Sequence, residues 1–364
     1  MKAPVHRSTK SNQMHDEEVD EVLYAGVDAH RTATHVTIVN DTGKVLTRRR
    51  ISSSSDELRR LFASYQEPFK AVVEATYNWG PVYDWLDEIA DDVVLAHPAK
   101  VRAIAEAHIK NDKIDSETLA QLLRADLIPA AYAPSKETRA IKRVLRQRLF
   151  FVRVQTMVKN RIHALLAQHA IVLPDVTDLY GKAGFAWLRQ LPLPEPDGQL
   201  LRDDLSLLAT LGERIAATDR LIAELAMGDV IITWLASLPG IGPFFSVLLR
   251  SEVDDMTRFR SAKKFARYTG LIPSTYASNT RIYHGPLTKQ GNKWLRWAFI
   301  EAVAPALRTS SSLRHYYDRI KARRGAHDAR VCTARKLAEL AWTVWTERRC
   351  FEERRARPLE KVAS

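Results

Sequence analysis

The sequence predicts an α/β domain followed by a mainly helical and strongly basic remainder. Residues 22–133 indicate the α/β domain, because short apolar runs alternate there with segments of helical periodicity. The pattern of one long helix, from residue 135 to about residue 170, opens the helical part. Lys and Arg number 55 against 43 acids, which gives a formal charge of +12 over 364 residues. A basic balance of this size favours a polyanionic partner, most simply nucleic acid.

Composition and length set further bounds on the protein class. A chain of 364 residues is expected to hold two or more domains. Two cysteines, Cys332 and Cys350, are too few for a disulfide framework, which predicts a reducing cytoplasm. No apolar stretch approaches the roughly 18 residues of a membrane span, so no membrane association is expected. Residues 1–20 lack the apolar core of a signal peptide and are interpreted as a disordered lead-in.

Two predicted strands of the α/β domain each end in an acid. The apolar run 22–27 ends at Asp28, and KAVVEAT places Glu74 at the end of a second strand. Between them, THVTIVN, the turn DTGK and VLTRRRI predict a hairpin that continues from the first strand. Helical patterns around residues 82–89 and 97–108 flank a buried strand, DVVLAH. Three strands in meander order, followed by alternating strands and helices, predict a ribonuclease-H-like sheet.

A third segment supplies two further acids. IKNDKIDSETLAQLL is predicted to be helical, so Asp112 and Asp115 lie on one face about one turn apart. Open α/β sheets collect their reacting groups at strand ends. Four converging carboxylates repel one another unless cations lie between them, and hard oxygen ligands suit Mg²⁺ or Mn²⁺. The joint pattern therefore favours a two-metal phosphoryl-transfer site over a set of solvated surface acids.

The predicted long helix is unusually basic. Between residues 139 and 161 it carries eight cations and no acid: Arg139, Lys142, Arg143, Arg146, Arg148, Arg153, Lys159 and Arg161. Solvated helix faces normally mix signs, so this run favours a phosphate-binding surface over a merely solvated face. Residues 172–198 are Pro-rich and are expected to form a connector. The helical pattern over residues 201–226 is expected to pack on the long helix or on a second subunit.

The chain beyond residue 229 predicts a compact basic domain. The segment Pro239 to Pro243, which contains Gly240 and Gly242, lies between two apolar helical patterns and fits a helix-hairpin-helix motif, in which backbone N–H groups approach a phosphate. The alternative is a tight turn between two helices. Residues 256–300 contain nine cations and no acid: Arg258, Arg260, Lys263, Lys264, Arg267, Arg281, Lys289, Lys293 and Arg296. Aromatic residues interleaved with these cations suit base stacking, although Trp297 fits the core equally well.

These landmarks, in this order, resemble the DEDD transposases of the insertion-sequence family one-hundred-and-ten. The resemblance runs from about Tyr24 to Trp345 and is carried by five segments: GVDAHRTATHVTIV, VVEATYNWG, KNDKIDSETLA, LPGIGPFFSVLLRSEV and GLIPSTYASNTRIYHGPLTKQGNKWLRWA. It implies a RuvC-like DEDD domain at residues 21–134, a helical connector at 135–228 and a C-terminal transposase domain at 229–350. The remaining residues, 351–364, are expected to form a basic tail.

The resemblance also implies roles for individual residues. It assigns the four metal-binding acids to Asp28, Glu74, Asp112 and Asp115, and a basic residue common after the first acid to Arg31. It assigns a nucleophilic serine to Ser278 in the pattern G-L-x-P-x-x-x-x-S, with Ser274 as an alternative. The family usually has glycine after this serine, and Asn279 stands there instead; Asn tolerates the left-handed backbone conformation.

The function expected from residues and resemblance together is site-specific DNA recombination. The serine hydroxyl attacks a DNA phosphodiester and forms a phosphoserine, and Mg²⁺ held by the acids stabilises the developing charge. Strand exchange needs two cleaved duplexes held together, so a dimer or tetramer is expected, and the resemblance implies a guide RNA from the element. Two alternatives are a metal-dependent nuclease or junction resolvase without a covalent intermediate, and a non-enzymatic nucleic-acid-binding protein.

Overall fold

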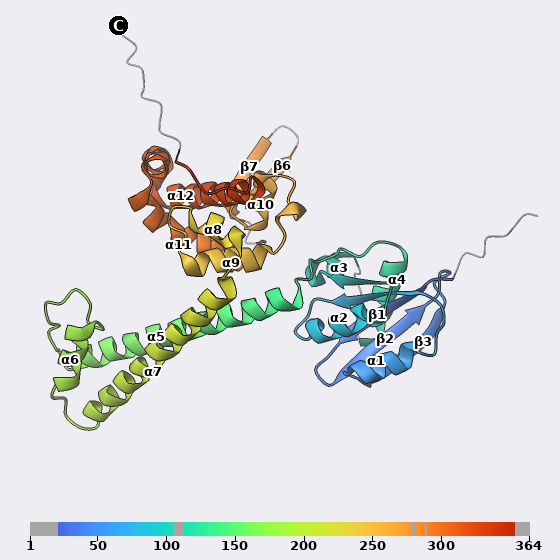
Figure 1. Ribbon diagram of the computed structural model, residues 1–364, viewed down its shortest axis with the longest axis horizontal. Helices are drawn as coiled ribbons and strands as arrows, with labels where there is room; N and C mark the ends of the chain where they lie inside the picture. The colour runs from blue at the N-terminus through green and yellow to red at the C-terminus, as the bar shows by residue number, and fades with distance from the viewer. Residues whose placement is uncertain (1–20, 105–111, 279–280, 288–289, 354–364) are drawn as a thin grey trace, which may run out of the picture. The chain divides into compact units, whose positions relative to one another are not determined.

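The structure is a computed structural model that describes residues 21–104, 112–278, 281–287 and 290–353 (Figure 1). The chain forms two compact units, residues 1–133 and 134–364. The expected lead-in at residues 1–20 and the end of the expected tail, residues 354–364, lie outside the described residues. No helix in the described ranges is both long and apolar enough to cross a membrane.

The first unit is built on a five-stranded mixed sheet. Its strands are β1 (Leu23–Ala29), β2 (Ala33–Val39), β3 (Val45–Ser52), β4 (Phe69–Glu74) and β5 (Asp92–Ala96). The order across the sheet is β3-β2-β1-β4-β5. The first three strands form an antiparallel meander, and β4 then pairs parallel with both β1 and β5. This mixed α/β arrangement is consistent with the predicted ribonuclease-H-like domain.

Helices cover both faces of this sheet. One face packs on α1 (Ser55–Phe62) and α2 (Trp79–Asp87), whose apolar residues share a core with alternate residues of β1, β4 and β5. The other face packs on α3 (Pro98–Ile104) and α4 (Asp112–Arg124). Because strand side chains alternate between faces and both faces are covered, the middle residues of β1, β4 and β5 are mostly apolar.

The second unit begins with a pair of long helices. The expected helix from residue 135 is confirmed as α5 (Lys136–Gln168), and its N-terminus is capped by Ser135, whose Oγ accepts from the N–H of Thr138. The expected partner is α7 (Asp197–Ala226), which lies along α5 in the same chain (Figure 1). The Pro-rich stretch between them contains one short helix, α6 (Lys182–Gln190), rather than connector alone.

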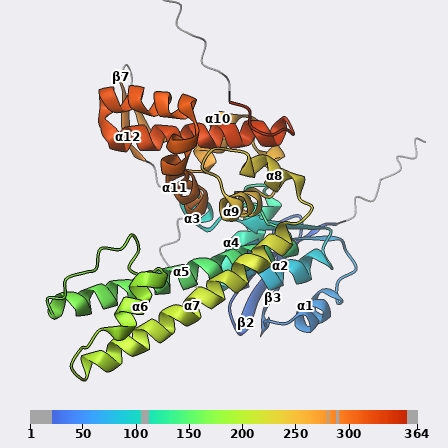
Figure 2. The ribbon, with the colours of Figure 1, turned by 60° about the vertical axis from the view of Figure 1, so that its left-hand side comes forward.

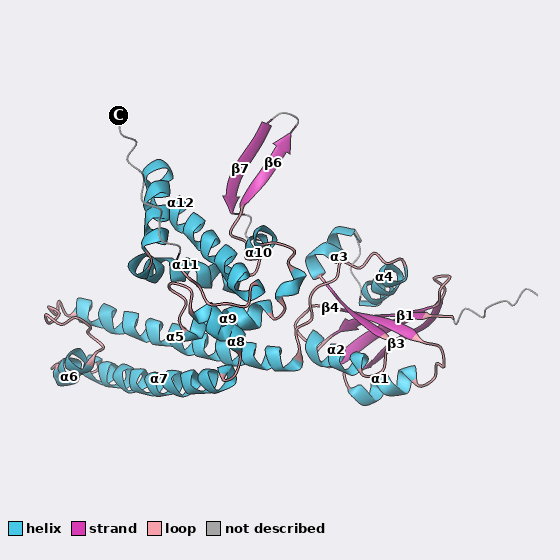
Figure 3. Ribbon diagram, turned by 45° about the horizontal axis from the view of Figure 1, so that its top comes forward, coloured by secondary structure: helices cyan, strands magenta, loops and turns pink. Residues whose placement is uncertain are grey.

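The rest of the second unit is a helical core that carries one β-hairpin. Its elements are α8 (Val230–Ala236), α9 (Pro243–Val253), the 3-10 turn η1 (Met256–Arg258), α10 (Ala262–Tyr268), β6 (Pro273–Ser278), β7 (Arg281–Leu287), α11 (Lys293–Thr309) and α12 (Ser311–Thr346). Figure 3 shows the β6–β7 hairpin standing out from these helices. Leu145 of α5 and Ile222 of α7 belong to the hydrophobic core of these C-terminal helices, so the two long helices pack directly against them.

Candidate active site

Asp28 and Glu74 lie at the carboxyl ends of neighbouring parallel strands. The register of β1 on β4 pairs Leu23 with Phe69 and ends with the pair Val27 and Val73. Asp28 and Glu74 are the next residues of the two strands, so they stand at the same level of the sheet. Asp28 is 7% exposed and Glu74 is half-buried. The predicted placement of both acids at strand ends is therefore confirmed.

Helix α4 crosses the sheet on the face that these two acids share. Gly26 is two residues before Asp28, so it belongs to the same face of β1. A Cβ atom on Gly26 would lie 1.9 Å from the backbone oxygen of Ser116 and 2.5 Å from the backbone nitrogen of Ala120. The hydroxyls of Thr37 and Ser116 are 2.9 Å apart and buried, which ties the same helix to β2. The absence of a side chain at Gly26 thus lets α4 lie directly on β1.

The direction of α4 brings its first turn to the edge that carries the acids. At the C-terminal end of the helix, Gln121 Nε2 donates to the oxygen of Gly43 at 2.7 Å, and Arg124 Nη1 donates to the oxygen of Asp41 at 3.1 Å. Both acceptors belong to the β2–β3 turn, which lies beside the start of β1. The opposite end of α4, which begins at Asp112, therefore points toward the end of β1. Asp115 is half-buried there.

The donor set at this edge suits a hard divalent cation. Asp28, Glu74 and Asp115 supply carboxylate oxygens, the ligands that Mg²⁺ and Mn²⁺ prefer. The side chain of the fourth acid, Asp112, lies outside the described part of the structure. Among the side chains that are described, no group of three or more His, Cys, Asp or Glu residues is positioned to hold a metal ion. The described side chains of Asp28, Glu74 and Asp115 therefore do not form a metal-binding group in this structure, although their carboxylate chemistry suits a hard cation.

One residue at this edge, His30, was missed by the sequence analysis. The Nε2 of His30 lies 3.1 Å from Asp28 Oδ2, so an imidazole contacts the first acid directly. The sequence contained a signal for this contact, because residues two apart on a strand share a face and His30 follows Asp28 by two positions. Arg31, expected as a basic neighbour, is exposed just beyond β1.

The two candidate serines lie at opposite ends of strand β6. Ser278 is the last residue of β6 and pairs with Arg281, the first residue of β7. Ser274 lies near the start of β6, where the register shifts between Pro273 and Thr275. The side chains of both serines and of Arg281 are outside the described part, as are Asn279 and Lys289 altogether. The predicted hairpin is thus confirmed, and Ser278 adjoins its turn.

The two ends of the hairpin segment are fixed closely together at its base. A Cβ on Gly291 would lie 2.5 Å from the nitrogen of Gly270, whose φ is +72°. The N–H of Asn292 donates to the oxygen of Tyr268 at 2.9 Å. Asn292 also caps α11, because its Oδ1 accepts from the first N–H groups of that helix. The half-buried Arg296 packs its guanidinium beside Gly270. The base of the hairpin is therefore a fixed platform.

A buried acid links this platform to the long helix. Glu252 of α9 is 5% exposed and accepts a hydrogen bond from Asn292 Nδ2 at 2.8 Å. It also pairs with Arg146 and lies 3.8 Å from Lys142 Nζ, both on α5. The guanidinium of Arg146 stacks 3.7 Å from the ring centroid of Trp294. Burial lowers the pKa of Lys142, and the nearby Glu252 carboxylate acts in the opposite direction.

The basic run on α5 therefore has counter-charges that the local sequence did not reveal. Besides Arg146, Arg148 pairs with Asp219 and Arg161 pairs with Asp204, both acids of α7. These cations hold the helices of the second unit together. Arg143, by contrast, is exposed. The expectation of a phosphate-binding face on α5 then rests on the exposed cations rather than on Lys142 and Arg146.

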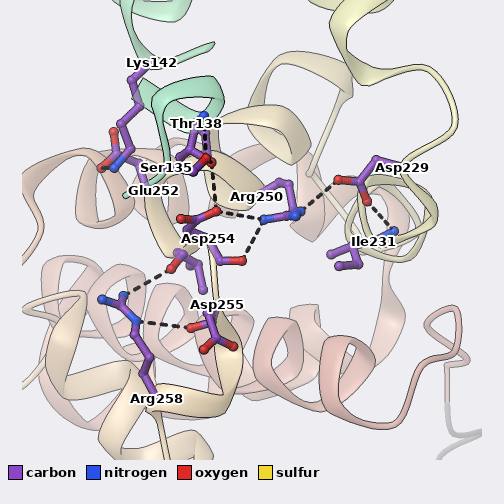
Figure 4. A network of polar contacts seen from close by, with 12 residues as sticks. Ser135, Thr138, Lys142, Asp229, Ile231, Arg250, Glu252, Asp254, Asp255 and Arg258 are labelled. Carbon is purple, nitrogen blue, oxygen red and sulfur yellow. Dashed lines mark hydrogen bonds and ion pairs between the residues drawn. The ribbon is translucent and has the colours of Figure 1, made fainter. Parts of the chain in front are cut away.

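A second polar network fixes the start of α5 (Figure 4). Asp254, just after α9, has φ +62°, a left-handed conformation that is unusual outside glycine. Its Oδ1 accepts from Thr138 Oγ1 at 2.8 Å, and its backbone oxygen accepts from Arg250 Nη1 at 2.7 Å. Arg250 Nε also donates to Asp229 Oδ2 at 2.8 Å. Helices α5, α8 and α9 are thus joined by one set of charge-assisted hydrogen bonds.

The two glycines of the turn between α8 and α9 differ in their surroundings. Gly240 has φ +79°, and a Cβ on it would lie 2.2 Å from the oxygen of Ala302 on α11. Its conformation and the close approach of α11 account for glycine at this position. Gly242 is exposed, and a Cβ there would meet nothing within 4 Å. Of the two, only Gly242 presents open backbone for a ligand.

The remaining expected nucleic-acid contacts fall into two groups. Lys263, Lys264 and Arg267 of α10 are exposed, as is Lys293 at the start of α11. Trp297 instead packs 5.2 Å from Phe245 in T-shaped geometry, which favours its core interpretation. Arg139 is half-buried near the start of α5.

Comparison with known proteins gives one consistent result. A transposase family model of the DEDD type of IS110 matches residues 25–171, and a model described as transposase IS116/IS110/IS902 family matches residues 233–318. A probable family 20 transposase of Pseudomonas aeruginosa is 27% identical over 287 residues, which covers 75% of this chain and 83% of that protein. The transposase for insertion sequence element IS1328 of Yersinia enterocolitica is 23% identical over 343 residues, covering 91% and 99%. The transposase for IS1111A of Coxiella burnetii is 20% identical over 347 residues, covering 91% and 92%.

Proposed function

Because the chain belongs to the IS116/IS110/IS902 family of transposases and is an enzyme that acts on DNA, we propose that it recombines DNA through a serine nucleophile and a carboxylate-bound metal. The observation that carries the proposal is the seating of α4 on β1 through Gly26. Because the N-terminal end of α4 points toward the end of β1, this seating supports a common site for Asp112 and Asp115 with Asp28 and Glu74.

The four acids have one chemical task in this proposal. Asp28, Glu74, Asp112 and Asp115 would hold Mg²⁺ or Mn²⁺, which when bound neutralises charge that develops on the phosphate oxygens. His30 contacts Asp28 and orients its carboxylate. The positive end of the α4 dipole points toward the same edge and reduces the repulsion between the acids.

Ser278 supplies the nucleophile. Its Oγ forms a bond to the DNA phosphorus while the bond from phosphorus to the leaving sugar oxygen breaks, and the hydroxyl proton ends on that oxygen. The free hydroxyl of an exchanged strand then attacks the phosphoserine and releases Ser278. The fixed base of the hairpin supports this role, because catalysis needs the nucleophile held on a rigid element.

The partners in this proposal are nucleic acids and further copies of the chain. Exposed cations of α10 and α11, together with Gly242, Arg139 and Arg143, would contact DNA phosphates. A guide RNA from the element and a dimer or tetramer in the cytoplasm complete the proposal. The basic composition supports a polyanionic partner and does not distinguish RNA from DNA.

A denaturing gel with labelled DNA tests the nucleophile. The parent protein should give a band that survives denaturant, Ser278→Ala should lose it, and Ser274→Ala should keep it. Loss in Ser274→Ala with retention in Ser278→Ala would move the nucleophile four residues upstream. Hydrolysed ends without any adduct would favour a metal-dependent nuclease or junction resolvase.

The acids need a separate test. Asp112→Ala and Asp115→Ala should each abolish strand cleavage while the fold and nucleic-acid binding persist, because each change removes one oxygen ligand. Cleavage by the parent protein in the presence of a chelator of divalent cations would contradict the metal-based mechanism. Unchanged function in both variants would favour a non-enzymatic nucleic-acid-binding protein.

A further inference from the structure

Helix α12 turns a corner that projects into solvent. Its regularity is broken at Gly325, where φ is +85° and ψ is 171°, so residues 311–324 and 326–346 form two arms (Figure 2). All residues from 321 to 328 are exposed, and a Cβ on Gly325 would meet nothing within 4 Å. No packing requirement therefore accounts for the composition of this corner.

The corner carries cations that have no carboxylate partner. Residues 314–330 contain six Lys or Arg and two acids. Within the described residues, none of the following cations lies within ion-pair distance of an acid: Arg319, Lys321, Arg323, Arg324 and Arg330. The cations of α5 differ, because four of them are paired with acids on neighbouring helices. The charge at the corner is thus available to an external anion.

The inner side of the corner is hollowed. A cavity of about 280 Å³ lies between α11 and the two arms of α12. Its polar and aromatic lining comes from Tyr317 on the first arm and from His327 and Arg330 on the second, and its other walls are aliphatic. Ligand sites for drug-sized molecules begin at roughly 300 Å³, so this hollow suits one planar ring system rather than a larger ligand.

We propose that this hollow binds an unstacked nucleotide of a single nucleic-acid strand, while the cations at the corner hold the neighbouring phosphates. Unpaired bases bury their faces against aromatic rings and guanidinium planes, and Tyr317 and Arg330 offer both. A duplex keeps its bases stacked and would use the cations without the hollow. The inference rests on the proposed action on nucleic acid and adds a strand-binding site far along the chain from the acids and Ser278.

The ring of Tyr317 is the first test. Fluorescence anisotropy with uridine and thymidine homopolymers, in the absence of divalent cations, measures single-strand affinity. Tyr317→Leu keeps apolar bulk but removes the stacking face, and should weaken binding by about 5- to 100-fold, whereas Tyr317→Phe should bind as the parent does. Circular dichroism checks that the variants fold. If Tyr317→Leu does not fold, Arg330→Gln provides a second variant that tests the same hollow.

The cations are tested through the salt dependence of binding. The double variant Arg323→Gln with Arg324→Gln should lower the slope of log affinity against log salt by about 1.4, since each phosphate contact on a single strand contributes about 0.7. Arg214→Gln with Arg220→Gln removes the same charge from exposed positions of α7 and should leave the slope unchanged.

The outcomes separate this site from the catalytic proposal. If Tyr317→Leu loses more affinity for the uridine polymer, the strand is assigned to RNA. If it loses more affinity for the thymidine polymer, the strand is assigned to DNA. Unchanged single-strand affinity in Tyr317→Leu and Arg330→Gln, or an equal loss of duplex binding, would overturn the inference. Ser278→Ala should bind both polymers normally. A parent protein that forms no covalent adduct but binds both polymers would therefore refute the serine mechanism without touching this site.

Discussion

Substituting Gly26 by alanine should disable catalysis by displacing α4. The added Cβ would lie 1.9 Å from the backbone oxygen of Ser116, and real Cβ atoms essentially never approach below 3.0 Å, so helix and strand must separate by about 1.1 Å. Neither group is the end of a flexible side chain, so the shift moves the backbone that carries Asp112 and Asp115. Overpacking of this kind costs about 1–3 kcal/mol of folding free energy. A misplacement of about 1 Å can cost about 100-fold in rate.

The assay for Gly26→Ala combines thermal unfolding, nucleic-acid binding and the yield of cleaved DNA per folded molecule. Cleavage should fall by about 100-fold while binding persists, since the basic surfaces are unchanged. Ser116→Ala is a control on the same helix: it removes the 2.9 Å contact to Thr37, costs about 1 kcal/mol and displaces nothing. Full cleavage and unaltered stability in Gly26→Ala would refute the seating of α4 on β1.

Three further predictions concern the second unit. Gly240→Ala should destabilise the fold, because its Cβ would lie 2.2 Å from the oxygen of Ala302 and φ is +79°; an unchanged melting temperature would contradict this packing. Glu252→Gln should cost about 2–4 kcal/mol in denaturant unfolding, because it leaves two largely buried cations without their counter-charge. Hydrogen bonds from the N–H of Ser312 and nearby groups lower the pKa of Glu353 from 4.5 to about 2. The contact between Glu353 and the start of α12 should therefore stabilise the fold above pH 4.5 and weaken as pH falls toward 2. A titration midpoint near 4.5 for the Glu353 carboxyl in the folded protein would contradict this.

The strand ends and helix starts were predictable because they depend on nearby residues. The run that ends at Asp28 is apolar on both faces, which is the pattern of a strand buried on both sides, and β1 is such a strand. Ser135 was recognisable as the start of α5, since short polar side chains satisfy the free N–H groups of a helix. The order of motifs likewise sufficed to identify the family.

The local sequence could not reveal which charges are opposed. The basic run of α5 contains no acid, but Glu252 lies more than a hundred residues later and is brought to Arg146 by the packing of α9 on α5. Its burial makes the pair structural rather than open to phosphate. Gly240 showed the same limit, because the turn pattern fits a phosphate-binding motif and only the position of α11 explains the missing side chain.

By itself, the sequence determined the family, the mixed sheet, the long helices and which acids and serines are candidates, because periodicity, caps and motif order are properties of short segments. The tertiary structure decided the direction in which α4 crosses the sheet, the burial of Glu252 among cations, and the hollow at the corner of α12. Each of these depends on contacts between residues far apart in the chain, and only the folded arrangement of helices and strands brings such residues within reach of one another.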